Sequence, residues 1–306
     1  MKYGMTGNIL RVDLSKKSHR IESPDETFYR TYFGGSALAC YYLLKERPTA
    51  VDPLSSENLL IFASSPLVGS GIPGTNRYSV AAISPLTGLY GEAEAGGWFS
   101  PELKKAGFDA VLVEGKAETP VYLWIHDGSV EIRDAAALWG KNTGETQDCI
   151  ESELGRSKVR VAAIGPGGEN LVRYACVVTD MKHTNGRGGM GAVMGSKNLK
   201  AVAVKGSGTI AAKNPEGLKK MIKWYADNFM DHPIQRVLHD GGTIGWDVTE
   251  LDEAGILPTR NFHSGSFEKA QDICGDTFHR DYFLKAGTCQ GCVVRCKRVA
   301  KSEGPW

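Results

Sequence analysis

An internal repeat constrains the fold of this chain more than any other feature, because a duplicated motif folds into two similar halves. Aligning Gly97 with Gly188, an offset of 91 residues, places residues 109–115 on residues 200–206. In both copies, glycines are followed by a helical stretch, a strand rich in Ala and Val, and a final glycine. Strands of this composition often match by chance, but the shared glycine positions favour duplication. The sequence therefore predicts a first domain that contains two copies of one β-rich motif.

Strand-like segments fill most of the chain up to residue 210, and helical segments dominate after it. Apolar runs and alternating patterns predict strands at 8–14, 59–63, 78–83, 110–113, 121–125, 130–133, 159–164, 174–178 and 201–204. Helical patterns cover 35–44, 98–106, 143–154, 216–227 and 276–285. We expect an α+β fold, with a β-rich N-terminal domain over residues 1–210 and the beginning of a helical domain over residues 211–306.

The charge balance gives no support to one large class of function. The chain has 36 basic and 35 acidic residues and a formal net charge of +1, so binding to nucleic acid is not expected. The N-terminus lacks the apolar segment and the cleavage site of a secretory signal. The apolar stretch 59–63 is too short to cross a membrane. We therefore expect a cytoplasmic protein with no membrane partner.

Three clustered cysteines near the end of the chain point to a metal centre. Cys289, Cys292 and Cys296 are separated by two and three residues, so one short loop can present three thiolates to one centre. Iron–sulfur clusters are commonly held by four such thiolates. A structural zinc site is the alternative, and it needs a fourth Cys or His. The nearest upstream candidates for that ligand are Cys274 and His279.

Two glycine-rich turns before helices form a second candidate site. Gly96-Gly97 opens the first helix of the repeat, and Gly188-Gly189 opens the second. Backbone N–H groups at the start of a helix favour anions, so two such turns suit a ligand with two phosphates or two ligands with one each. Arg187 lies in the second turn, and Arg77 follows a Gly/Pro/Ser loop at 64–75. Arginine binds phosphate by paired hydrogen bonds, although each arginine alone could be a solvated surface charge.

Long ordered stretches of the chain resemble the N-terminal part of the tungsten-containing aldehyde:ferredoxin oxidoreductase family. These stretches cover residues 7–14, 84–88, 96–99, 102–110, 164–171 and, most specifically, 186–201. The resemblance extends over essentially the whole chain. It implies a duplicated β-rich domain that binds a bis-pterin cofactor, followed by the start of all-helical domains.

The resemblance also implies a set of cofactors and site residues. The cofactors are a tungstopterin, in which two molybdopterins hold W or Mo and are bridged by Mg2+ through their phosphates, and a 4Fe-4S cluster. By motif match, Arg77, Gly96, Arg187 and Gly188 would contact pterin, and the three cysteines would bind the cluster. The implied reaction oxidises a small aldehyde to a carboxylic acid and passes electrons through the cluster to ferredoxin. A homodimer is compatible with the resemblance.

The chain departs from the family pattern in three ways. Family members continue far beyond residue 306, so we expect an incomplete chain that is inactive alone and lacks the fourth cluster cysteine and the acid/base groups. Glu94 stands where the family often has Asn, and we hypothesise that its carboxylate lies close to the Mg2+. Arg295, Lys297 and Arg298 surround the last cysteine, where they could stabilise a reduced cluster, attract an acidic carrier, or form an ordinary solvated turn.

Two other functions stay open at this stage. One is a related tungstoenzyme that acts on another carbonyl or on a thioester. The other is a non-catalytic protein that uses the three cysteines for zinc or binds a cofactor without turnover. The sequence does not separate tungsten from molybdenum, nor does it define the substrate.

Overall fold

The computed structural model describes residues 3–46, 51–155, 158–245, 248–301 and 303. The chain divides into two compact units, Met1–Pro215 and Glu216–Trp306, which we call unit 1 and unit 2 and describe separately. The boundary expected at residue 210 lies in the segment that leads from the last strand of unit 1 to the helix beginning at Pro215.

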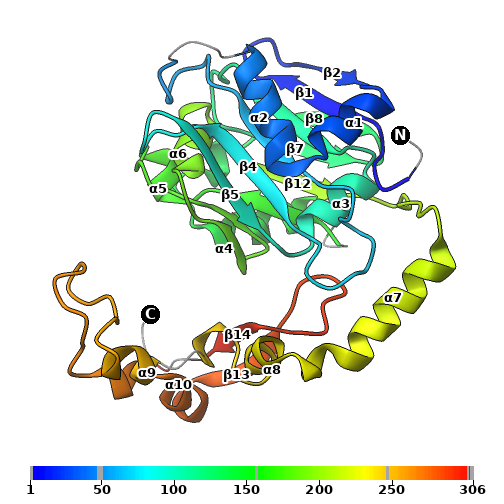
Figure 1. Cartoon of the computed structure of the whole chain (residues 1–306). Helices are drawn as coiled ribbons and strands as arrows, with labels where there is room; N and C mark the ends of the chain where they lie inside the picture. Colours follow the sequence, from blue (N-terminus) through cyan, green and yellow to red (C-terminus); the bar gives the residue numbers. More distant parts are fainter. Residues whose placement is uncertain (1–2, 47–50, 156–157, 246–247, 302, 304–306) are drawn as a thin grey trace. The chain divides into compact units, whose positions relative to one another are not determined.

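Unit 1 contains two six-stranded sheets (Figure 1). Sheet 1 is built from β1 (Ile9–Asp13), β2 (Ser18–Glu22), β3 (Leu60–Ala63), β4 (Tyr78–Ile83), β5 (Tyr90–Ala95) and β6 (Ala110–Glu114). Its order is β2-β1-β6-β3-β4-β5. Within it, β1 and β6 pair in parallel, and the other neighbours pair antiparallel.

Sheet 2 repeats this arrangement. It is built from β7 (Val121–His126), β8 (Ser129–Asp134), β9 (Arg160–Ala163), β10 (Val177–Thr179), β11 (His183–Asn185) and β12 (Leu199–Lys205). Its order from the β8 edge is β8-β7-β12-β9-β10-β11, and β7 and β12 form its parallel pair. Both sheets therefore place a hairpin, its parallel partner and three further antiparallel strands in the same sequence, which confirms the predicted duplication.

Helices cover the outer faces of the sheets, and the main core lies between them. The helices of unit 1 are α1 (Glu26–Tyr32), α2 (Gly35–Glu46), α3 (Phe99–Lys105), α4 (Thr143–Glu153), α5 (Pro166–Glu169) and α6 (Met190–Ser196), with a 3-10 turn at Ala136–Leu138. The largest core cluster joins side chains of both copies, such as Phe62 and Phe99 with Val193 and Val202. Separate clusters pack α2 on sheet 1 and α4 on sheet 2. α3 and α6 precede β6 and β12, as the repeat predicts.

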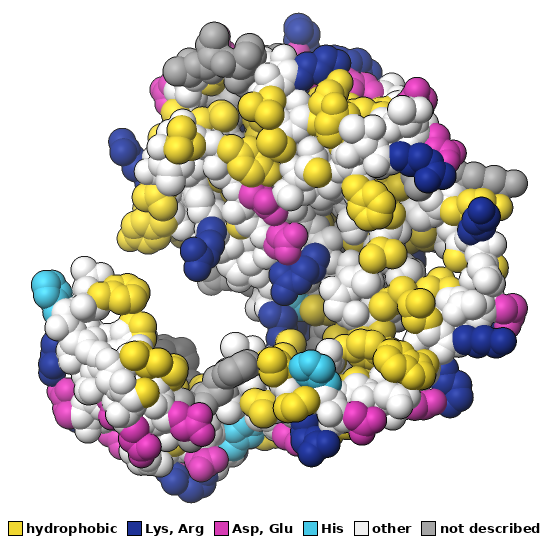
Figure 2. Space-filling model, in the orientation of Figure 1, with side chains coloured by type: hydrophobic (Ala, Val, Ile, Leu, Met, Phe, Trp, Pro, Cys, Tyr) yellow, Lys and Arg dark blue, Asp and Glu magenta, His cyan; other side chains and the backbone are white. Residues whose placement is uncertain are grey.

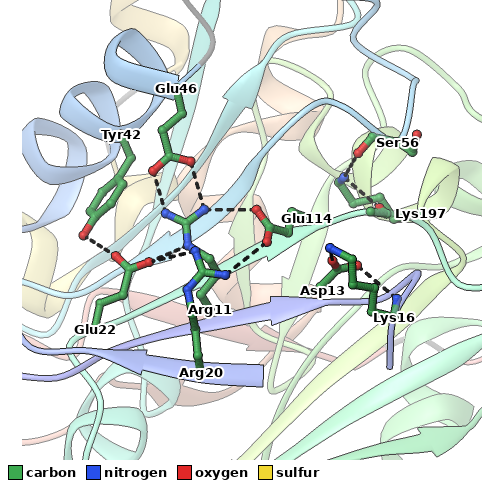
Figure 3. Close-up of polar contacts among 11 residues, drawn as sticks. Arg11, Asp13, Lys16, Arg20, Glu22, Tyr42, Glu46, Ser56, Glu114 and Lys197 are labelled. Carbon is green, nitrogen blue, oxygen red and sulfur yellow. Dashed lines mark hydrogen bonds and ion pairs between the residues drawn. The ribbon is translucent and has the colours of Figure 1, made fainter. Parts of the chain in front are cut away.

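A buried arginine ties the outer face of sheet 1 together (Figure 3). The Arg11 side chain on β1 is 2% exposed and contacts three carboxylates. It pairs with Glu22 on β2 at 2.6 Å, Glu46 at the end of α2 at 2.6 Å, and Glu114 on β6 at 3.1 Å. Such a guanidinium joins three strands and a helix through charge-assisted hydrogen bonds.

Unit 2 consists of short helices and one small sheet. The helices are α7 (Pro215–Asn228), α8 (Pro233–Asp240), α9 (Val248–Glu253) and α10 (Gly275–Asp281), with 3-10 turns at Phe229–Asp231, Thr243–Gly245 and Ala270–Ile273. β13 (Phe283–Gly287) pairs antiparallel with β14 (Lys297–Ala300). The helix predicted at 276–285 is therefore wrong from residue 283, where the chain enters β13. In unit 1, the strand predicted at 174–178 is also wrong at its start, because β10 begins only at Val177.

Unit 2 leaves large apolar side chains exposed on α7 and α8 (Figure 2). Met221 is 55% exposed and Trp224 63% exposed on α7, and Ile234 is 48% exposed on α8. Among the helices of the described residues, none is both long and apolar enough to cross a membrane.

Candidate functional site

The candidate cofactor site is built where one edge of sheet 1 meets one edge of sheet 2. β5 is the last strand of sheet 1 and β11 is the last strand of sheet 2, and the two lie in contact. The side-chain amide Nδ2 of Asn185 on β11 donates a hydrogen bond to the carbonyl of Ala93 on β5 at 2.8 Å. This contact brings the glycine turns of the two copies to opposite ends of β5.

The first turn, Gly96-Gly97, follows β5 directly and leads into α3. Gly97 has φ +112°, and a Cβ atom there would lie 2.7 Å from the imidazole Cδ2 of His183. His183 belongs to β11 of the second copy. Only glycine fits this position, because any side chain would be strained and would also meet the ring. The turn of one copy is thus fixed against a strand of the other.

The second turn lies at the start of β5. Gly188 and Gly189 have φ +72° and +76°. The Ser84 hydroxyl donates to the Gly188 carbonyl at 2.7 Å, and a Cβ at Gly188 would lie 3.7 Å from the Cα of Gly91. A Cβ at Gly189 would come within 2.0 Å of the Arg173 carbonyl oxygen. Close backbone packing therefore requires both glycines and fixes the N-terminus of α6.

The charged residues predicted for the site lie on its exposed side. Arg77 directly precedes β4, and its Nη1 lies 3.5 Å from Oε2 of Glu94 on β5. The side chains of Arg77 and Glu94 are 60% and 49% exposed, so this ion pair contributes little to stability and both groups can reach a ligand. Arg187 is also exposed, next to the second turn. The structure therefore gathers Arg77 and Glu94 at the first turn and places Arg187 at the other end of β5.

The loop that leads to Arg77 is held by a buried lysine. Lys104 on α3 is 2% exposed. Its Nζ donates to the carbonyls of Ser65 at 3.0 Å and Val68 at 3.1 Å, and also to the carbonyl of Gly4. Burial lowers the pKa of the Lys104 ammonium to about 8. The Gly/Pro/Ser loop predicted to approach a ligand is therefore anchored at its base.

A buried carboxylate near the first turn was missed by the sequence analysis. Asp180, in the turn between β10 and β11, is 7% exposed. Neither of its carboxylate oxygens has a hydrogen-bond partner among the described residues. Burial raises the pKa of Asp180 to about 6, although the nearby Arg160 acts in the opposite direction. The guanidinium of Arg160 lies 5.0 Å from the ring of Trp98, which follows Gly97. No sequence pattern marked Asp180, because only the packing of β10 on β9 buries it.

The glycine-rich segment at 165–170, which lacks the third glycine of a dinucleotide fingerprint, serves the packing of the site. Glu169 ends α5, and its 4% exposed side chain pairs with the fully buried ammonium of Lys200 on β12. Gly195 on α6 has no room for a side chain, since its Cβ would lie 2.0 Å from the Gly168 carbonyl oxygen. α5 thus supports α6, whose first residues carry the second turn.

The three clustered cysteines lie on the connection between β13 and β14 in unit 2. The amide of Cys292 donates to the carbonyl of Cys289 at 3.2 Å, and the Thr288 hydroxyl donates to the Cys292 carbonyl at 2.6 Å. Across the described residues, no three His, Cys, Asp or Glu side chains are gathered closely enough to hold a metal ion. Thiolate donors on one tight loop are nevertheless the ligand chemistry of iron–sulfur centres.

The upstream candidates for a zinc ligand lie elsewhere in unit 2. Cys274 and His279 line a cavity of about 170 Å³ together with Gln271 and Asp276. The Cys274 thiol donates to the Gln271 carbonyl at 3.2 Å, and Nδ1 of His279 lies 2.8 Å from the Gly275 carbonyl. These contacts use both side chains within the helix α10 region.

Comparison with known families and structures gives consistent matches along the chain. Residues 9–206 match the family described as "Aldehyde ferredoxin oxidoreductase, N-terminal domain". Residues 220–306 match "Aldehyde ferredoxin oxidoreductase, domains 2 & 3". The tungsten-containing aldehyde ferredoxin oxidoreductase of Pyrococcus furiosus is 41% identical over 313 residues, which cover 99% of this chain and 51% of that protein.

Other similar proteins carry different names. The WOR-like subunit of an aliphatic sulfonate oxidoreductase of Pyrococcus furiosus is 32% identical, over 97% of this chain and 50% of that protein. Among solved structures, the active-site complex BamBC of benzoyl coenzyme A reductase with 1,5-dienoyl-CoA matches with a TM-score of 0.85 and 34% identity, over 99% of this chain and 48% of the matched chain. The chain spans about half the length of each of these proteins.

Proposed function

Because this chain belongs to the aldehyde ferredoxin oxidoreductase family, we propose that it supplies the cofactor-binding part of a tungsten-containing enzyme that oxidises aldehydes to carboxylic acids. The observation that carries this proposal is the meeting of β5 and β11. It brings an arginine-bearing glycine turn from each copy of the duplicated motif to one strand. Two equivalent turns suit a cofactor that contains two equivalent pterins.

The residues at these turns fit the phosphate ends of such a cofactor. Arg77 and Arg187 are exposed and can donate paired hydrogen bonds to phosphate oxygens. Gly97, Gly188 and Gly189 let the backbone come close to a ligand, because each has a positive φ and close neighbours. We propose that these residues, with Gly96, bind the tungstopterin.

Glu94 is proposed to face the magnesium that bridges the two phosphates. Its half-exposed carboxylate lies beside Arg77, in a region where phosphate would otherwise repel it. A divalent cation between them removes this repulsion and takes oxygen ligands from both sides. The exchange of the family's usual Asn for Glu is then compatible with cofactor binding.

The cysteine loop is proposed to hold a 4Fe-4S cluster through Cys289, Cys292 and Cys296. Oxidation of an aldehyde by water releases two electrons and two protons, and a bis-pterin tungsten centre supplies the two-electron chemistry. A 4Fe-4S cluster transfers one electron at a time, which suits a ferredoxin acceptor. A fourth ligand from outside this chain is part of this proposal.

Metal and pterin analysis of the anaerobically purified chain tests the proposal. We expect iron, tungsten or molybdenum, and pterin released on oxidative denaturation. Arg77→Met and Arg187→Met should each lower pterin content, whereas Arg30→Met should not, because Arg30 is 71% exposed and pairs only with Glu26 on α1. Zinc without iron, tungsten or pterin would show that the alternative, a zinc protein, is right.

A second candidate substrate follows from one comparison. The benzoyl coenzyme A reductase complex that this chain resembles is described with a dienoyl-CoA, so a coenzyme A thioester is an alternative to an aldehyde. Dye-linked assays of the complete enzyme with short aldehydes and with aromatic CoA thioesters separate the two. Activity with aldehydes alone supports the first proposal, and activity with thioesters alone supports the second.

A further inference from the structure

Arg298 stands out in unit 2 because its guanidinium is held on several sides by other groups. Nη1 donates to the carbonyls of Arg295 at 2.8 Å and Lys297 at 3.1 Å. Nη2 donates to the carbonyl of His239 at 2.6 Å, and Nε lies 3.4 Å from Nε2 of His279. A lysine could not make this set of contacts, because it lacks the planar fork of donors.

Two of these contacts fix the backbone around the last cysteine. The carbonyls of Arg295 and Lys297 belong to the residues directly before and after Cys296. The amide of Thr243 donates to the Cys296 carbonyl at 3.2 Å. Cys296 is therefore clamped between Arg298 and the turn that follows α8. The Cys296 thiolate also acts on Arg298, since it opposes the lowering of the arginine pKa that burial causes.

The turn after α8 is shaped around Arg298. Gly242 has φ +73°, and a Cβ atom there would lie 2.7 Å from Cγ of Arg298 and 3.0 Å from the Cys296 carbonyl oxygen. His239, whose carbonyl accepts from Arg298, lies in the last turn of α8, where carbonyls lack partners within the helix. The sequence Gly241-Gly242 thus makes room for an arginine that caps α8 and supports the cysteine loop.

The other basic residues of this loop behave differently. Arg295 is exposed, and only its backbone carbonyl takes part in the contacts just described. The sequence grouped Arg295, Lys297 and Arg298 as one basic turn, but the structure separates a fixed, partly buried charge from a solvent-facing one. A charge in a partly desolvated site acts more strongly on its neighbours than one in water.

We propose that Arg298 is a positioning residue that raises the reduction potential of the cluster bound by Cys289, Cys292 and Cys296. This inference rests on the proposed function of the cysteine loop. A fixed positive charge next to a cluster thiolate favours the reduced state, which carries one more electron and so one more negative charge. The hydrogen bonds to both neighbours of Cys296 keep that charge at a constant distance from the cluster.

A redox titration of the anaerobically purified chain, reconstituted with iron and sulfide and followed by electron paramagnetic resonance, tests the inference. Arg298→Met should lower the equilibrium constant for one-electron reduction by about tenfold, which is about 59 mV for a one-electron couple. Arg295→Met is the matched control, because it removes the same charge from the same loop at an exposed position. We expect its shift to be less than a third as large.

Two further variants keep the result interpretable. Arg298→Gln removes the charge but keeps a hydrogen-bond donor, so it should shift the potential as Arg298→Met does even where the methionine variant loses iron. Arg298→Lys keeps the charge and should recover most of the wild-type potential. Equal potentials in wild type, Arg298→Gln and Arg298→Met would overturn the inference alone. A wild-type chain that takes up no iron would instead overturn the proposed function of the loop and, with it, the inference.

Discussion

Loss of the buried lysine on β12 should destabilise unit 1 strongly, because it would leave a carboxylate without its counter-charge. The Lys200 side chain is 0% exposed and pairs with Glu169, whose side chain is 4% exposed. Lys200 also donates to the Lys141 carbonyl at 2.8 Å. The second carboxylate oxygen of Glu169 accepts from the Gly140 amide at 2.9 Å. In Lys200→Met, that amide would be the one remaining partner of a buried negative charge among these groups.

The magnitude follows from the burial of both groups. Breaking a buried ion pair by removing one partner costs about 3–5 kcal/mol, much of it from the charge left behind. Removing both charges, in Lys200→Met with Glu169→Gln, should cost clearly less than the two single changes together. We expect a coupling energy of about 2 kcal/mol or more between the two positions. The exposed pair of Arg30 and Glu26, one turn apart on α1, should show only about 0.3–0.5 kcal/mol.

Equilibrium unfolding in urea measures these values. Trp124 lies on β7, next to β12, and is 7% exposed, so its fluorescence reports on sheet 2. Free energies of unfolding for wild type, both single variants and the double variant complete the cycle, and Arg30→Met serves as the surface control. A Lys200→Met variant within about 1 kcal/mol of wild type, or strictly additive changes, would refute the reasoning.

Two further outcomes are expected in unit 1. Gly97→Ala should lower both urea stability and pterin retention more than Gly74→Ala; both positions have positive φ, costing roughly 1–2 kcal/mol, but only Gly97 would place a Cβ against His183, whereas Gly74 has open space. Equal losses would show that the contact with His183 is unimportant. Asp180 has a folded pKa of about 6, above its usual 3.8, so the native state holds a proton that the unfolded chain has lost. Its contribution is therefore full below pH 3.8 and disappears as pH rises through 6, by up to roughly 3 kcal/mol. Asp180→Asn should remove this loss, and an unchanged difference in unfolding free energy between pH 4 and pH 7 would contradict it.

The edge strand β5 shows why sequence analysis located the site but not its framework. β5 reads Tyr-Gly-Glu-Ala-Glu-Ala, and its inward positions Gly91, Ala93 and Ala95 are buried. These small residues rank low in strand propensity, so the alternation was not recognised as a strand. They are small because the second copy packs there, as the Asn185 contact with Ala93 shows. The glycine turns were visible in the sequence, but the strand that joins them was not.

Unit 2 shows a different limit. The prediction of a helix over 276–285 followed from local pattern, and α10 does occupy Gly275–Asp281. Beyond it, Phe283–Gly287 pairs with Lys297–Ala300 across the cysteine loop. That pairing joins residues more than ten positions apart, so local propensity does not register it. The cysteines were found from spacing alone, whereas their support by Arg298 depends on this sheet.

The two copies of the repeat also differ at one buried position in a way that explains what duplication can and cannot predict. Asp109 and Lys200 occupy equivalent places before β6 and β12, and both are fully buried. The Asp109 carboxylate accepts from the amides of Thr6 and Gly7, both at 2.8 Å, whereas Lys200 pairs with Glu169. A buried charge persists only with a partner, and each partner here lies outside the aligned segments. The repeat therefore predicts the backbone and the need for a polar group there. The sign of the charge follows from neighbours that each copy acquired separately.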